Sequence, residues 1–244
     1  GHILGSAMIE FTRGNAQIVF TGDLGNTPDS VLPDFEPLFK ARYLVIEGVY
    51  GDTTHEGKDS ARDRLEDIVE WVIRKNGVLL IPAFSVERTQ KMLFEIKTMM
   101  EEKRIPSIPV FLDSPLAIEA TELYAKYTGF LKKNAREGWE NGAIFSFPEL
   151  RKTLTREESE GIARTPNPKI IIAGSGMSLG GRILFHERAY LPDPNSTILF
   201  VGYQVEGSPG RQILDGKKEV KILGQPIQVN CANRTKEGYS HHPK

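Results

Sequence analysis

The chain has 244 residues, of which 39% are hydrophobic and 26% are charged, so it can build a packed core and is not expected to be disordered. Its 31 Lys and Arg residues nearly balance its 32 Asp and Glu residues, which gives a net charge of −1. This balance excludes a nucleic-acid binder that depends on a large basic excess. It does not exclude a nuclease, because a bound metal ion supplies positive charge locally.

The single cysteine, Cys231, excludes an internal disulfide framework and a cysteine-rich zinc module. No run of about 20 apolar residues is present, and no signal peptide precedes the first strand-like run. We therefore expect a soluble, cytoplasmic protein with no membrane partner. Gly1 stands where an initiator Met is expected, and both ends look cut.

Strand-like and helix-like segments alternate along most of the chain. Residues 17–21 and 43–47 are predicted strands, and residues 60–75 carry apolar side chains at helical spacing. Residues 78–82 form a continuous apolar run, which is typical of a buried parallel strand. The same alternation then predicts helix 85–103, strand 109–113, helix 118–127, strand 169–173 and strand 197–202.

Two regions differ from this pattern. Residues 128–168 are polar with isolated aromatic anchors, and we expect connecting helices and loops there. Residues 220–229 alternate around a turn at 224–226, which predicts antiparallel strands.

The alternation predicts βαβ units and a parallel sheet, flanked by two β-rich pieces. Because a small sheet cannot bury a face by itself, we expect the flanks to pair. Residues 1–51 and 189–244 would then form one domain, with residues 52–188 inserted as a parallel α/β domain.

Five residues that could bind a metal or act on a substrate lie near the ends of predicted strands. Imidazole and carboxylate ligands suit zinc or manganese. The residues match no local ligand motif, so a surface or hydrogen-bonded role for each histidine stays open. They are His2, Asp23, Glu47, His186 and His242.

Asp23 lies in a tight turn between Gly22 and Gly25. A carboxylate in that position could bridge two cations. It could equally be a turn residue that caps backbone N–H groups.

Residues 174–177 (Gly-Ser-Gly-Met), followed by residues 180–182 (Gly-Gly-Arg), resemble a turn that cradles a phosphate. A tight connection between a strand and a helix is the alternative. The dinucleotide-binding fingerprint is absent, so a nucleotide-binding domain would rest on this turn alone. Arg88 begins a predicted helix, where an arginine is ordinarily solvated.

Taken in order, these segments resemble the metallo-β-lactamase fold and its β-CASP branch, a group that processes nucleic acids. Residues 1–7 (Gly-His-Ile-Leu-Gly-Ser-Ala) and 20–25 (Phe-Thr-Gly-Asp-Leu-Gly) resemble the third and fourth metal motifs. Residues 46–52 resemble the first motif of the β-CASP branch. The match continues through residues 82–90, 113–117, 174–186, 201–211 and 238–242, nearly the whole length of the chain.

The resemblance implies an α/β fold: part of an αββα sandwich with an inserted parallel α/β domain. It also implies two zinc ions in the complete protein, with His2 as a ligand of one, Asp23 bridging both and His242 as a ligand of the second. Glu47 would orient an imidazole beside the scissile phosphate, and His186 would stabilise or protonate the leaving group.

The substrate-binding residues implied by the resemblance are Ser175, Gly176 and Arg88. Ser175 and the N–H groups around Gly176 would hold a phosphate oxygen. The implied activity is zinc-dependent hydrolysis of phosphodiester bonds in RNA, preferably single-stranded. DNA as a substrate and a homodimeric assembly stay open.

Three departures from the family pattern qualify this prediction. The His-x-His-x-Asp-His motif that supplies most zinc ligands is absent from the chain, and Gly48 and Val49 replace the usual Ser and Thr after the motif's Glu. The last motif ends in Lys244 instead of an acid, so His241 remains an alternative to His242. We therefore expect this chain by itself to bind zinc poorly and to be inactive. A non-catalytic scaffold that binds RNA or a processing partner is the alternative.

Overall fold

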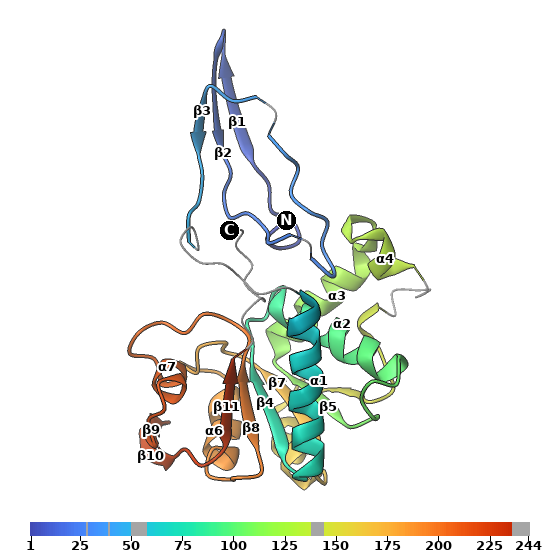
Figure 1. The fold of residues 1–244 in the computed structure, drawn as a ribbon, viewed down its shortest axis with the longest axis vertical. Helices are drawn as coiled ribbons and strands as arrows, with labels where there is room; N and C mark the ends of the chain where they lie inside the picture. The colour runs from blue at the N-terminus through green and yellow to red at the C-terminus, as the bar shows by residue number, and fades with distance from the viewer. Residues whose placement is uncertain (28, 39, 50–57, 138–143, 236–244) are drawn as a thin grey trace.

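The computed structural model of the protein describes residues 1–27, 29–38, 40–49, 58–137 and 144–235. These residues form two parts (Figure 1). A three-stranded sheet near the N-terminus projects from an α/β body that is built around a six-stranded sheet.

The six-stranded sheet has the order β11-β8-β4-β7-β5-β6, and every pairing recorded in it is parallel. Its central strands are apolar on both faces because helices cover both sides, which explains their unbroken hydrophobic runs. The sheet confirms the predicted α/β fold with a parallel sheet. Its strands are β4 (Val78–Pro82), β5 (Val110–Asp113), β6 (Leu150–Lys152), β7 (Lys169–Ala173), β8 (Thr197–Phe200) and β11 (Ala232–Thr235).

Successive residues of β4 point into two different cores. Leu79 and Ile81 pack with the side chains of α1, α2 and α3, whereas Val78 and Leu80 pack on the opposite face with α6 and α7. This division follows from the two-residue period of a strand. The helices are α1 (Lys58–Arg74), α2 (Arg88–Glu101), α3 (Pro115–Lys126), α4 (Lys133–Arg136), α5 (Arg156–Gly161), α6 (Ile183–Tyr190) and α7 (Pro209–Leu214).

The N-terminal sheet contains β1 (Ile9–Arg13), β2 (Ala16–Phe20) and β3 (Tyr43–Val45). β1 pairs with β2 in antiparallel orientation, and β2 pairs with β3 in parallel orientation. Apolar side chains on this sheet stay exposed among the described residues: Phe11 is 58% exposed and Tyr43 is 56% exposed. The connection to the body runs through Val31 and Leu32, which are buried in the core with α1, α2 and α3.

Near the end of the described chain, β9 (Glu219–Ile222) and β10 (Gln225–Gln228) pair in antiparallel orientation. The hairpin predicted around residues 224–226 is therefore confirmed. Strands β1, β6 and β11 were not predicted from the sequence.

The described part of residues 189–244 differs from the predicted return to the N-terminal part, whereas residues 236–244 lie outside the described residues. β8 pairs with β4 through Thr197 and Ile198, and β11 pairs with β8. Both strands therefore belong to the sheet of the α/β body. The reason is that β8 is buried along its whole length, like β4, and finds its hydrogen-bonding partner beside β4. The expected boundary at residues 51 and 52 lies outside the described residues and stays a prediction.

Candidate functional site

The first cluster of predicted site residues lies where β2 ends. Asp23 follows a turn at Gly22, whose φ of +58° lies in the left-handed region that favours glycine. Asp23 Oδ2 lies 3.7 Å from His2 Nε2. Gly25 makes this approach feasible, because a Cβ atom at Gly25 would lie 2.2 Å from the carbonyl carbon of Gly1.

Glu47 joins the same cluster because β2 and β3 are neighbours. Its Oε1 accepts a 2.7 Å hydrogen bond from the backbone N–H of Leu24, the residue after Asp23. The backbone N–H of Glu47 in turn donates to Thr21 Oγ1 at 3.4 Å. The carboxylate of Glu47 thus holds the turn that carries Asp23. The structure brings His2, Asp23 and Glu47 together across 45 residues of sequence.

A pocket of about 570 Å³ opens beside this cluster. Asp23 lines it together with three other acidic residues, Glu10, Asp34 and Glu36, and with the aromatic ring of Phe130. Carboxylates repel a phosphate group, so a phosphodiester could bind close to these side chains only with a cation that compensates their charge.

The described residues do not complete a zinc site. His2 and Asp23 supply two donors of suitable chemistry, whereas zinc sites use three or four protein ligands. No group of three His, Cys, Asp or Glu side chains suited to a metal was found within the part of the chain that the structure describes. The third predicted ligand, His242, and its alternative, His241, lie outside the described residues.

A second cluster lies at the carboxyl edge of the six-stranded sheet, where β4, β5 and β7 end side by side. Ser85 Oγ and Ser114 Oγ are 3.5 Å apart. Gly174 packs against both, because a Cβ atom there would lie 3.6 Å from Ser114 Oγ and 3.9 Å from Ser85 Oγ. Ser175 comes next in the chain, so three serine residues from three loops lie around one glycine.

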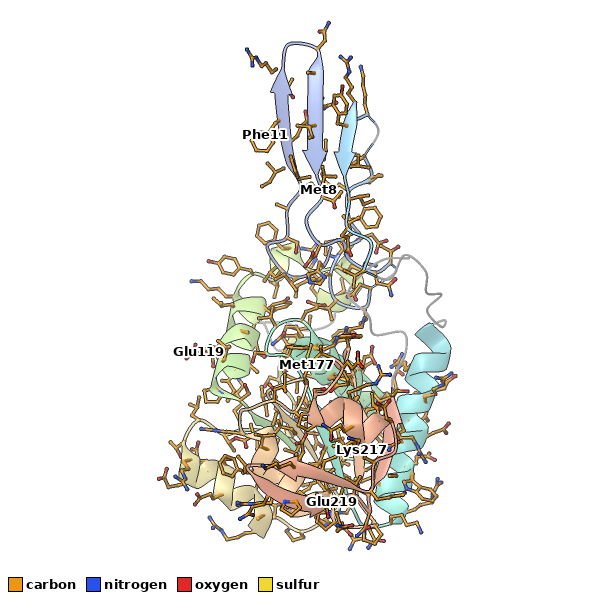
Figure 2. All side chains as sticks on the ribbon, turned by 90° about the vertical axis from the view of Figure 1, so that its left-hand side faces the viewer. Met8, Phe11, Glu119, Met177, Lys217 and Glu219 are labelled. Atoms are coloured by element: carbon orange, nitrogen blue, oxygen red, sulfur yellow. The ribbon has the colours of Figure 1, made fainter. Side chains whose placement is uncertain are left out.

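The loop of residues 174–182 is fixed by hydrogen bonds at both ends. Ser175 N–H donates to the Gly180 carbonyl at 2.9 Å, and Ile183 N–H donates to the Gly174 carbonyl at 3.0 Å. Gln204 Nε2 donates to the Gly176 carbonyl at 2.7 Å. Figure 2 shows Met177 of this loop at the end of the α/β body that faces the N-terminal sheet.

His186 lies on α6, which follows this loop, and its side chain contacts the carboxylate of Asp113. Its Nε2 is 2.7 Å from Asp113 Oδ2, and its side chain is buried. Burial by itself would raise the pKa of Asp113, but hydrogen bonds from His186, Ser159, Thr153 and Arg182 lower it to about 2. None of the contacts recorded for His186 in the described residues reaches Asp23 or Glu47, so its proton-donor role stays a prediction.

Arg88 is buried in the α/β body. It is 4% exposed at the start of α2, so the expectation of a solvated side chain was wrong for this arginine. Its role in substrate binding stays a prediction.

A contact that was not predicted from the sequence connects the segment of His2 to the α/β body. Tyr124 accepts a hydrogen bond from Leu4 N–H at 3.0 Å and donates to Glu87 Oε2 at 2.7 Å. Burial and the nearby Asp29 raise the pKa of Glu87 to about 7.

The role of Asp113, which contacts both His186 and Arg182, was also not predicted from the sequence. The sequence signal that could have identified Asp113 is an acidic residue at the end of an apolar strand.

No helix among the described residues is both long and apolar enough to cross a bilayer. Comparison with known proteins gives a family match. Residues 89–213 match the family model described as the Beta-Casp domain.

The chain is also similar to curated proteins along almost its whole length. It is 36% identical over 246 residues to Ribonuclease TTHA0252 of Thermus thermophilus, an alignment that covers 99% of this chain and 56% of that protein. It is 32% identical to Transcription termination factor FttA of Thermococcus kodakarensis, covering 99% and 39% respectively. It is 32% identical to the RNase J-like protein of Methanocaldococcus jannaschii, covering 94% and 53%. The chain spans about half or less of the length of these relatives.

Proposed function

The chain belongs to the β-CASP branch of the metallo-β-lactamase family, and from that premise we propose that it is part of a zinc-dependent nuclease that hydrolyses phosphodiester bonds in single-stranded RNA. The family is metal-dependent and includes ribonucleases. The observation that carries the proposal is the pairing of His2 with Asp23 at 3.7 Å, beside the acidic pocket. An imidazole and a carboxylate in this arrangement suit a zinc ion.

In this proposal His2 and Asp23 are zinc ligands, and His242 is a third. The described residues do not complete the site, so the proposal of zinc rests on the family and on this pair. Glu47 is a positioning residue, because its carboxylate accepts from the backbone N–H next to Asp23. It fixes the direction in which the Asp23 carboxylate points.

The serine cluster is the second element of the proposal. Ser175 and the backbone at Gly176 would bind a phosphate oxygen of the RNA, and Ser85 and Ser114 lie close enough to Gly174 to contribute hydroxyl groups. Glycine at positions 174 and 176 lets the serine hydroxyl groups and the Phe84 ring pack against the backbone of this loop. His186 would supply a proton to the departing oxygen, and Arg88 would add positive charge.

A cleavage assay of the complete protein, with single-stranded RNA labelled at its 5′ end and added zinc, tests the proposal. Asp23→Asn is expected to abolish zinc-dependent cleavage. Asp34→Asn is the matched control, because Asp34 lines the same pocket but pairs with Lys132 at 3.0 Å. The same sequence as DNA tests the substrate class. Equal activity of wild type and Asp23→Asn would contradict the proposal.

The non-catalytic scaffold is the second candidate. The observation in its favour is the incomplete set of zinc ligands among the described residues. It predicts RNA binding that survives Asp23→Asn, with no cleavage by wild type in the presence of zinc.

A further inference from the structure

Phe84 is an aromatic residue held at the carboxyl edge of the sheet with part of its ring in solvent. It follows the end of β4 and is 40% exposed. Its ring lies on two stretches of glycine backbone. A Cβ atom at Gly176 would lie 2.8 Å from Phe84 Cδ2, and a Cβ atom at Gly202 would lie 3.4 Å from its Cε2.

The backbone that carries this ring is fixed by side chains of α2. Thr89 Oγ1 donates to the Phe84 carbonyl at 2.8 Å, and Gln90 Nε2 donates to the Ser85 carbonyl at 3.1 Å. Thr89 is 1% exposed and Gln90 is fully buried. The partly exposed ring is therefore presented from a rigid loop, which lowers the entropic cost of binding a ligand there.

The glycine backbones beneath the ring are tied to each other. Gln204 Nε2 donates to the Gly176 carbonyl at 2.7 Å and to the Gly202 carbonyl at 3.1 Å. Gln204 is 3% exposed. Tyr203, between Gly202 and Gln204 in sequence, is 56% exposed. Phe84 of the loop after β4 thus lies between the serine cluster and the glycine backbones of the loops after β7 and β8.

Hydroxyl groups and an exposed ring side by side match the two halves of a nucleotide. The hydroxyl groups of Ser85, Ser114 and Ser175 suit phosphate oxygens. The face of an aromatic ring suits a base, because every base has a π-face on which such a ring can stack. A phenylalanine kept partly in water at a rigid position forgoes hydrophobic stabilisation, and binding a base would recover it.

We propose that Phe84 is the stacking platform for a base of the RNA whose phosphate lies at Ser175 and Gly176. This inference rests on the proposed function and adds to it a contact that tolerates any base sequence. Purines would stack more strongly than pyrimidines, because their rings overlap a larger area.

Anisotropy measurements of a labelled oligoadenylate and a labelled oligouridylate, at one fixed salt concentration, test the proposal. Phe84→Ala is expected to weaken oligoadenylate binding about tenfold, the usual scale for loss of one stacked base. Phe84→Leu should weaken it to a similar extent, whereas Phe84→Trp should preserve it. The loss for oligouridylate should be smaller.

Trp71→Ala is the matched control. Trp71 is also 40% exposed, but it lies near the end of α1, where the chain approaches the opposite edge of the sheet. Its replacement should leave binding unchanged. A fluorescent adenine analogue in the RNA should be quenched on binding to wild type and to Phe84→Trp, and not on binding to Phe84→Leu.

The outcomes separate this inference from the proposed function. Absence of RNA binding by wild type would overturn the proposed function and the stacking platform together. Binding by wild type with a change of less than twofold in Phe84→Ala would overturn the stacking platform alone. Full binding by Phe84→Leu would also overturn it, because an apolar contact would then suffice. Circular dichroism of each variant establishes that it is folded.

Discussion

Asp113 and His186 are 73 residues apart in sequence, yet Asp113 Oδ2 lies 2.7 Å from His186 Nε2 inside the protein. The Asp113 side chain is fully buried. Its other oxygen accepts a 2.8 Å hydrogen bond from Arg182 Nη1. One carboxylate therefore holds both Arg182 at the end of the glycine-rich loop and His186 on the helix that follows.

This contact gives a prediction about stability. His186→Ala removes one of the donors to a buried carboxylate, which should lower the free energy of unfolding by about 1–3 kcal/mol. Urea unfolding of wild type and variant measures the change. The control is Arg188→Ala on the same helix, where the replaced side chain is exposed. A loss no greater than that of the control would mean that Asp113 does not depend on His186.

Metal content separates the roles of Asp23 and His186 in the complete protein. Asp23→Ala should remove bound zinc and RNA cleavage together, since Asp23 would bind both ions. His186→Ala should leave the zinc content nearly unchanged and lower the cleavage rate about a hundredfold or more, the usual scale for an acid–base group. Metal analysis beside a single-turnover cleavage assay measures both. Similar zinc loss in both variants would exclude the proton-donor role.

The stability of the protein should fall as the pH rises from about 5 to about 8. Burial raises the pKa of Glu187 to about 7, above the value expected in the unfolded chain. Below that unfolded value both states bind the proton. Between that value and about pH 7, the unfolded state releases the proton and the folded state keeps it. A rise in pH over this range therefore favours the unfolded state, and the free energy of unfolding falls.

Glu187→Gln should flatten this pH dependence, because Gln does not ionise. Unfolding in urea at several pH values measures the slope. Part of the slope should remain, since the pKa of Glu87 is also raised to about 7. Glu119→Gln is the control, since Glu119 is exposed on α3 (Figure 2). Equal slopes for wild type and Glu187→Gln would contradict the assignment.

Gly176→Ala tests the close packing beneath Phe84. The new Cβ atom would lie 2.8 Å from Phe84 Cδ2 and 3.0 Å from the Phe84 backbone nitrogen, so the loop after β4 must shift. We expect a loss of about 1–3 kcal/mol in the free energy of unfolding.

Gly180→Ala in the same loop is the matched control for this change. Nothing lies within 4 Å of a Cβ atom at Gly180, so its free energy of unfolding should stay close to that of wild type. Thermal or urea unfolding distinguishes the two variants. Similar stability of both would show that the ring of Phe84 moves aside without cost.

The sequence by itself determined the parallel sheet and its central strands. The runs at 78–82 and 169–173 carry this information locally, because a strand covered on both faces must be apolar at every position. It also determined the hairpin of β9 and β10 through its alternation and turn. It did not reveal the short strand β6, whose three residues contain two exposed cations.

Only the tertiary structure decided which strands and which side chains meet. β8 is apolar and buried, like β4. Its local sequence does not indicate whether it pairs with β4 or with the N-terminal sheet. The pairing of His2 with Asp23 likewise depends on the close approach of Gly1 and Gly25. His186 was recognisable as a functional candidate from its motif. Its contact with Asp113 was decided by how α6 packs on the sheet, because contacts between distant segments are set by packing of the whole chain and not by local pattern.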